Sequence, residues 1–416
     1  MNVASYAETP NFVADMRRIL FACCMWLLAA PLLTAQVAID DVRDLQAGFN
    51  NSKGLGWRTA DSLFSMQLRF RMQNRFVYNT RSTSDLRQQS TEMMVRRLRL
   101  RFNGNLGSPR LFYAIQLGFS IEDMDGDINS LSNIIRDALA EYRLTDKLTI
   151  GMGQGKLPGN RERVNSSGDL QLVERSLFNR TFNIDRDFGT FFRYKGGKNG
   201  SRFNVIGAIS SGSGRNVRSN SEGFCYTARV EFLPLGDFSS YGDYFQGDLI
   251  REPKPKISIA IANAFNRNAI RTGSQIGAVM AEMKDINTTF ADIIFKYRGF
   301  AWSAEGGIRT NSGSPLTTDL EGGNIFIFRG FGYSTQASYC TPKYWEGAAR
   351  FTRVQPQDII AFLTPPRQEW TLGVTRYLRN HRVKMQSDVS LIEVIPQNGF
   401  SGSSHFSFRF QIEVGI

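Results

Sequence analysis

Two neighbouring stretches of this sequence place polar or cationic side chains at every second position. In VRRLRLRFNG (95–104), three apolar residues alternate with Arg97, Arg99 and Arg101. In LFSMQLRFRMQNRFVY (63–78), apolar residues alternate with Arg69, Arg71, Gln73 and Arg75. A guanidinium is permanently charged and can donate paired hydrogen bonds to phosphate or carboxylate oxygens. Evenly spaced arginines could therefore bind anions and pass them from one to the next.

The alternation itself predicts β-strands. Successive side chains of a strand point to opposite faces, whereas at helical spacing the same arginines would surround the helix and leave no apolar stripe. Each stretch should therefore form a strand with one apolar and one polar face. The C-terminal stretch HFSFRFQIEVGI (405–416) shows the same pattern.

The N-terminal region predicts export. Arg17 and Arg18 precede the apolar run ILFACCMWLLAAPLL (19–33), and Ala35 is a suitable last residue of a leader. The run is shorter than the roughly 18–20 residues that span a membrane. We expect a signal peptide at 1–35, with Met16 as an alternative start, followed by a short N-terminal periplasmic segment at 36–61.

Composition excludes several classes of protein. No later run is long enough for a membrane helix, and the mean hydropathy is −0.27. Only Cys225 and Cys340 remain after the leader, so no disulfide framework is expected. The net charge of +12 favours anionic partners. Since the sequence carries no RRM, zinc-finger or helix-turn-helix pattern, nucleic acid is not an expected partner.

Beyond residue 61, alternation recurs in sixteen segments joined alternately by short turns and long loops. The segments are 62–78, 93–104, 110–122, 136–144, 147–155, 187–195, 201–210, 223–233, 255–265, 289–297, 300–309, 332–340, 344–353, 368–378, 382–390 and 404–416. The one long connection on the short-turn side is 234–254. This layout predicts an all-β fold: a transmembrane antiparallel β-barrel of about 16 strands over residues 62–416.

The cost of charge in lipid decides which face points inward. An arginine on the lipid face at the bilayer midplane costs about 2–4 kcal/mol. Three on one strand would cost on the order of 6–12 kcal/mol, comparable with the roughly 5–15 kcal/mol that stabilise a whole domain. Arg97, Arg99 and Arg101 should therefore line a water-filled lumen. In this register three other arginines fall on the lipid face, each near a strand end: Arg96, Arg353 and Arg376.

The longest loop follows the fifth predicted strand and runs from Lys156 to Asp187. We expect this third long loop to fold inward and narrow the channel. The stretches RRLRLRFNGNL (96–106), GQGKLPGNRERVNSSGDLQLVERS (153–176), DRDFG (185–189) and KYWEGAARFTRVQPQ (343–357) resemble the phosphate-selective porin O and P family of bacterial outer membranes.

The resemblance implies a sixteen-stranded, homotrimeric porin that passes anions along an arginine ladder and through a basic constriction. The ladder motif falls on Arg97, Arg99 and Arg101, and the basic residues of the loop motif are Lys156, Arg161, Arg163 and Arg175. The loop also carries three acids, Glu162, Asp169 and Glu174, so strict phosphate selectivity does not carry over. The chain ends in Ile416, where such barrels usually end in an aromatic residue.

The sequence thus predicts a porin in the outer membrane of a Gram-negative bacterium. Its expected partners are small anions or other small hydrophilic solutes and the lipid around it, and no cofactor, metal or catalysis is expected. Inward bases outnumber inward acids in the predicted strands, which favours anions. Many arginines could nevertheless pair with carboxylates; we expect a salt bridge between Glu346 and Arg350.

Other functions have weaker support in the sequence. A structural or adhesive barrel is the main alternative. An esterase or phospholipase is disfavoured because neither His381 nor His405 has a serine and an acid at a suitable spacing. A plugged transporter would need about 22 strands. The stretch EDMDGDIN (122–129) lacks the spacing of a calcium loop and should be a solvated acidic loop.

Overall fold

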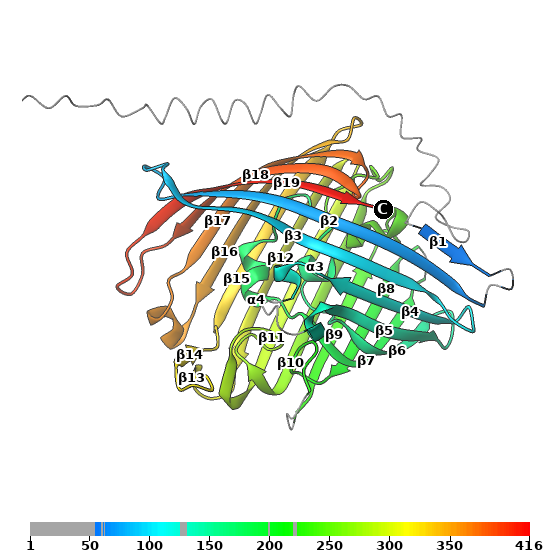
Figure 1. The fold of residues 1–416 in the computed structure, drawn as a ribbon, viewed down its shortest axis with the longest axis horizontal. Coiled ribbons are helices and arrows are strands. Elements are labelled where there is room, and N and C mark those ends of the chain that lie inside the picture. The colour runs from blue at the N-terminus through cyan, green and yellow to red at the C-terminus, as the bar shows by residue number, and fades with distance from the viewer. Residues whose placement is uncertain (1–54, 60, 62, 125–130, 199, 219–222) are drawn as a thin grey trace, which may run out of the picture. The chain divides into compact units, whose positions relative to one another are not determined.

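The computed structural model describes residues 55–59, 61, 63–124, 131–198, 200–218 and 223–416, within the compact unit 44–416 (Figure 1). The predicted signal peptide and most of the predicted segment 36–61 lie outside the described residues. Sixteen antiparallel strands close into one barrel, as predicted, and every predicted strand is present. The barrel strands are β2 (Ser65–Thr80), β3 (Gln88–Asn105), β4 (Leu111–Gly118), β5 (Ile135–Arg143), β6 (Leu148–Lys156), β7 (Arg186–Gly196), β8 (Arg202–Ser210), β9 (Cys225–Leu233), β10 (Lys256–Arg271), β11 (Val279–Tyr297), β12 (Phe300–Asn311), β15 (Gly330–Cys340), β16 (Trp345–Pro356), β17 (Arg367–Arg379), β18 (Val383–Val394) and β19 (Ser403–Gly415).

Smaller elements complete the described part of the chain. Three short strands are β1 (Leu55–Arg58), β13 (Leu316–Thr318) and β14 (Asn324–Phe326). The α-helices are α3 (Arg161–Val164) and α4 (Leu177–Phe182), and the 3₁₀ helices are η3 (Ile121–Asp123), η4 (Leu131–Ile134), η5 (Ser239–Tyr244) and η6 (Asp358–Phe362). No helix among the described residues is both long and apolar enough to cross a membrane.

The first and last barrel strands close the ring. β19 pairs with β2 from Ser407 opposite Asn79 to Gly415 opposite Arg71. Past the end of β19, β1 continues along the same edge of β2, with Leu55 opposite Leu68. This short strand was not predicted, because four residues are too few to establish an alternation. It leaves less of the β2 edge unpaired.

A β-bulge at Arg96 reverses which side chains of β3 point inward between the bulge and the N-terminal end of the strand. Gln73 lies opposite Arg97, but Asn74 lies opposite Val95, so Arg96 is an extra residue without a partner on β2. A bulge places an additional side chain on one face and reverses the alternation beyond it. Arg96 consequently points into the barrel, and its predicted position on the lipid face is wrong. Arg353, by contrast, follows the predicted register, on the face of β16 opposite to Arg350.

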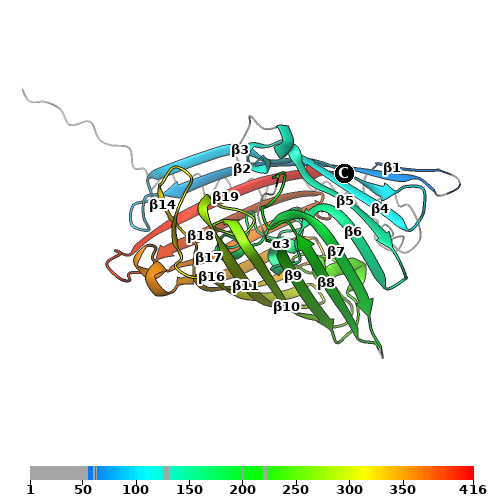
Figure 2. The same ribbon diagram turned by 90° about the horizontal axis from the view of Figure 1, so that it is seen from below.

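The β6–β7 loop (residues 157–185) lies within the ring of strands, where both views show α3 surrounded by strands (Figures 1 and 2). Its main-chain oxygens accept hydrogen bonds from side chains on opposite sides of the barrel: from Gln73 on β2, Arg229 on β9, Arg309 on β12, Arg350 on β16 and Lys384 on β18. A segment that reaches all these strands at once can only run through the interior.

A dry core forms between the loop and one side of the wall. Leu157, Leu177, Phe178, Phe182 and Ile184 from the loop pack with small or apolar inward side chains, including Ala208, Ala262, Ala264 and Phe290. Phe178 stacks on Phe182 at 5.2 Å between ring centroids. The two rings fit because the facing wall carries glycine: a Cβ on Gly332 would lie 2.7 Å from Phe182. Apolar burial of this kind fixes the loop to the wall.

Candidate functional site

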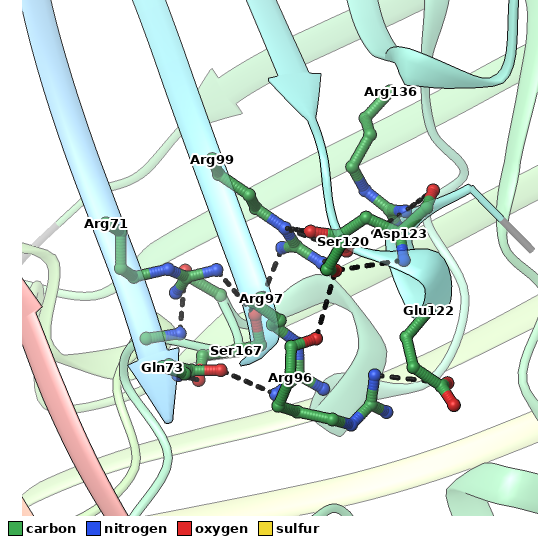
Figure 3. Close-up of polar contacts among 12 residues, drawn as sticks. Arg71, Gln73, Arg96, Arg97, Arg99, Ser120, Glu122, Asp123, Arg136 and Ser167 are labelled. Atoms are coloured by element: carbon green, nitrogen blue, oxygen red, sulfur yellow. Dashed lines mark hydrogen bonds and ion pairs between the residues drawn. The ribbon is translucent and has the colours of Figure 1, made fainter. Parts of the chain in front are cut away.

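The inward-facing arginines of β2 and β3 form three levels, which together we call the arginine cluster. The cross-strand register places Arg69 opposite Arg101 and Arg71 opposite Arg99, while Arg97 lies opposite Gln73. The lower level is therefore Arg69 and Arg101, nearest the short-turn end, and the middle level is Arg71 and Arg99. The upper level consists of Arg75, Arg96 and Arg97. Figure 3 shows the middle level and part of the upper level with the residues that contact them.

The upper level is held by one carboxylate of the β6–β7 loop. Glu174 accepts hydrogen bonds from Arg75 and, at 2.7 Å, from Nε of Arg96, and lies 3.7 Å from Arg97. Burial opposes the ionisation of Glu174, but the charges of these arginines outweigh it and hold its pKa well below the usual range. Glu174 therefore stays charged and ties the loop to the wall.

The middle level is paired by acids from two different directions. Both oxygens of Asp123 in η3 accept hydrogen bonds from Arg99, and Asp123 also lies 3.3 Å from Arg136 (Figure 3). Arg71 donates to Ser167 of the loop at 2.8 Å and lies 3.8 Å from Glu413. The expectation of a solvated acidic loop is therefore wrong at Asp123, which is buried; residues 125–129 lie outside the described part of the chain.

The lower level differs from the other two because neither arginine has an ion-pair partner among the residues that the structure describes. Arg69 donates to the amide oxygen of Asn103 at 3.0 Å. Nε of Arg101, which faces Arg69 across the strands, has no hydrogen-bond partner there. Like charges that face each other across two strands repel. Both side chains are only partly buried, and the carboxylates that act on them, Asp137 and Asp169, form no ion pair with them, so this level is the least tightly paired part of the cluster.

The basic residues predicted in the β6–β7 loop are engaged elsewhere. Arg161 pairs with Glu231 on β9 and Asp292 on β11, each at 3.0 Å, which anchors α3 to the wall. Arg163 pairs with Asp185. Lys156 and Arg175 both donate to the main-chain oxygen of Asn165, each at 2.9 Å. These four bases therefore stabilise the loop and its attachment, and of the four Arg175 also lies near enough to Arg97 and Arg99 for their charges to repel.

The acids of the loop also have structural partners. Glu162 accepts hydrogen bonds from the main-chain N–H of Ser176 at 3.0 and 3.1 Å and lies 3.6 Å from Arg350. The carboxylate of Asp169 is attracted by the charges of Lys384, Arg71 and Arg69, and its main-chain oxygen accepts a hydrogen bond from the N–H of Gln246 at 3.0 Å. Of the seven loop residues predicted to form a constriction, only Glu174 forms ion pairs with the cluster.

One prediction about pairing and one omission from the cluster need correction. Arg350 pairs with Glu162 and, at 3.9 Å, with Glu369, whereas Glu346 accepts from Tyr377 and Gln171. Residues four apart in a strand are separated by about 13 Å, too far for the predicted salt bridge. Arg96 was missed as a member of the cluster because its doublet with Arg97 carries no periodic signal. That doublet was the available sign of a bulge.

No group of three or more histidine, cysteine or acidic residues in the described part of the chain could hold a metal ion. Cys225 and Cys340 are free and buried.

Comparison with solved structures identifies the fold. The anion-selective porin from Comamonas acidovorans superposes with a TM-score of 0.52 at 12% identity, over 84% of this chain and 99% of that one. OmpF of Salmonella typhi superposes with a TM-score of 0.55 at 11% identity, over 86% of this chain and 100% of OmpF. The outer-membrane channel DcaP of Acinetobacter baumannii superposes with a TM-score of 0.51 at 12% identity, over 88% of this chain and 100% of DcaP. No curated protein sequence matches the chain.

A closed sixteen-stranded barrel with apolar residues outside and charged residues inside is the fold of bacterial outer-membrane porins, and this chain has that fold. Residues 66–244 match the model of the phosphate-selective porin O and P family, which confirms the predicted resemblance. The matched region contains the whole arginine cluster and the β6–β7 loop.

Proposed function

We propose that this porin lets small hydrophilic solutes diffuse passively across the outer membrane, that it prefers anions, and that it acts as a homotrimer without catalysing a reaction. The observation that carries the preference is the lower level of the cluster. Arg69 and Arg101 face each other inside the barrel without an ion-pair partner among the described residues. Their charge is therefore available to a passing solute, unlike that of Arg99 or Arg161.

The range of this charge supports the proposal. At about 0.1 M salt the Debye length is near 10 Å, comparable with the reach across a narrowed pore. Two unpaired guanidinium groups then lower the barrier for an anion and raise it for a cation. Paired N–H donors suit phosphate and carboxylate groups, and Arg69 and Arg101 together offer such donors. Phosphate is thus one suitable solute among several small anions.

The test is ion selectivity in planar bilayers. We expect the reversal potential in a KCl gradient to report chloride over potassium, and the preference to weaken as salt rises. The double variant Arg69→Gln/Arg101→Gln should shift the reversal potential toward potassium. Since Arg97 is paired with Glu174, Arg97→Gln is a matched control and should change selectivity less. A cation-selective unmodified channel, or a double variant with unchanged selectivity, would contradict the proposal.

One observation favours a second function. The β6–β7 loop fills much of the interior with buried apolar side chains, as a structural or adhesive barrel could tolerate. Such a protein would give no single-channel steps in a bilayer. Conductance therefore separates the two functions before selectivity is measured.

A further inference from the structure

The two sides of the barrel interior differ sharply in exposure. On the side formed by β2 to β8, inward charged side chains remain partly accessible: Arg71 and Asp137 are 16% and 17% exposed, and Glu141 and Arg193 are 24% and 34% exposed. On the side formed by β9 to β19, the corresponding side chains of Arg229, Lys384 and Asp388 are all 0% exposed. The charged side chains of β2 to β8 are therefore the more accessible ones, although the loop also buries Phe191 on β7 and Ala208 on β8.

The buried side is covered by two segments, of which the β6–β7 loop is one. The second is the β9–β10 connection (residues 234–255), the single long connection on the side of the short turns, which in such barrels is the periplasmic side. It turns inward and meets the loop: the N–H of Gln246 donates to Asp169 at 3.0 Å, and that of Gln171 donates to the Gln246 side chain at 3.1 Å. Tyr244 donates to Glu231 at 2.8 Å.

The base of the connection is fixed to the wall. Lys296 on β11, which is buried, donates to the main-chain oxygens of Gly242 and Phe245 at 2.6 and 2.9 Å. Asp248 accepts hydrogen bonds from the main-chain N–H of Gly299 at 2.7 Å and of Glu252 at 3.0 Å. Glu252 in turn accepts from Ser239 at 2.7 and 2.9 Å. Hydrogen bonds to buried charged groups are strong, so the connection is a fixed part of the fold.

A cavity lies where the two segments meet. The cavity is small, about 40 Å³, and is bounded by the loop, by Phe245, Gln246 and Gly247 of the connection, and by inward side chains of β11, β12 and β15 such as Lys296, Glu305 and Gln336. The connection thus lies between this polar space and the short-turn end of the barrel.

We propose that the β9–β10 connection is a fixed periplasmic plug, which closes the side of the lumen bounded by β9 to β19 and confines solutes to the side lined by β2 to β8. The proposal rests on the proposed channel function and adds the position of its pathway. Solutes then pass the partly exposed Arg71 and Asp137 and leave past Glu141 and Arg193, along the edge of the connection, where Lys195 on β7 lies over the ring of Tyr241. Arg69 and Arg101 lie on the same side, so the unpaired charges border the open route.

The principal test removes the inward part of the connection. In a Cys225→Ser/Cys340→Ser background, residues 240–246 are replaced by two glycines. Opening the covered side should raise single-channel conductance about twofold, in proportion to the added cross-section. Gln336→Cys, which is buried against the two segments, should become reactive toward a charged methanethiosulfonate reagent only in the shortened protein. Gln116→Cys on β4, on the open side, should react in both proteins and is the matched control.

A second variant keeps the test decisive if the shortened protein does not fold. Gln171→Cys and Gln246→Cys place a crosslink between the loop and the connection, which already touch. Because the plug is fixed, oxidation should leave conductance unchanged. A current that oxidation abolishes and reductant restores would show a moving gate and overturn the proposal.

The outcomes for plug and channel are separable. Unchanged conductance in the shortened protein, with Gln336→Cys still unreactive, overturns the plug and leaves the channel standing. A full-length protein that never conducts overturns the proposed function, and a current that appears only after shortening would still support the plug.

Discussion

At the scale of single residues, the arginines of the cluster differ in whether they have an ion-pair partner. All seven guanidinium groups point inward, but Glu174, Asp123 and Glu413 pair with the upper and middle levels. Removing one partner of a buried pair costs about 3–5 kcal/mol, because the other charge remains uncompensated. The paired arginines therefore hold the loop and η3 in place, while the unpaired level is available to solutes.

Glu174→Gln tests this division. The change leaves Arg75, Arg96 and Arg97 without their shared carboxylate, so we expect attachment of the β6–β7 loop to weaken by on the order of 3 kcal/mol. Trypsin should then cleave the loop at its arginines much faster, and the channel should become more anion-selective. Glu122→Gln is the control: Glu122 also pairs with Arg96 but is 45% exposed, so its loss should alter stability by less than about 0.5 kcal/mol. Equal cleavage of the two variants would contradict the prediction.

The pH dependence of the same contact follows from the lowered pKa of Glu174. A carboxyl group whose pKa is lower in the folded state stabilises it at every pH above the unfolded value, about 4.3 for glutamate. That contribution is lost only as the pH falls through the folded value. A fluorophore on Arg180→Cys, an exposed position in α4, should therefore report an attached loop from pH 7 to about pH 4. Release of the loop near pH 5 would show that the arginines do not hold the carboxylate charged.

At the scale of elements, period-two alternation was sufficient to predict every strand of the barrel. Bulges and loop paths depend on contacts that local sequence does not encode. The bulge adds one residue, Arg96, to β3. A single inserted residue does not change the alternation on either side of it, so its only sign in the sequence is the pair Arg96–Arg97. The paths of the β6–β7 loop and the β9–β10 connection are set by partners such as Asp292 and Lys296, more than 40 residues away from the segments they hold.

One signal in the sequence could have indicated where the loop packs. The inward positions of β10 include Ala260, Ala262 and Ala264, and Gly332 lies inward on β15. Small residues on an inward face leave room that another segment must fill, since protein interiors are close-packed. The aromatic residues of α4 are the matching feature. Reading the two together would have indicated that the loop covers this wall.

Phe178→Ala tests how α4 is attached to the wall. Phe178 is fully buried and contacts Phe182 and Phe290, so its truncation should destabilise the protein by about 3–5 kcal/mol. The denaturant midpoint for loss of the compact gel form reports this change. Phe203→Ala removes a ring of the same size from the outer face, where detergent replaces it, and should lower the midpoint far less. A similar loss in both variants would mean that the inner aromatic core is not what holds the loop.

At the scale of the whole molecule, the outer face is apolar and the inner face is polar, which fits the outer membrane. The proposed trimer makes a prediction of its own. Unheated samples should migrate as a compact oligomer on denaturing gels and change to a slower-migrating unfolded monomer only after boiling. Light scattering in mild detergent should give three chains per particle. A single chain per particle would contradict the trimer but not the barrel.

The junction between β2 and β19 has a consequence for the lifetime of the folded state. Arg71 pairs with Gly415, at the opposite end of the chain, and this last pairing seals the loop and the connection inside. Contacts so distant in sequence form late, because a long chain segment must first be closed. The enclosed segments must therefore be in place before the ring shuts. Once sealed, neither can leave unless the junction ruptures, so the protein should persist under denaturing conditions for kinetic reasons.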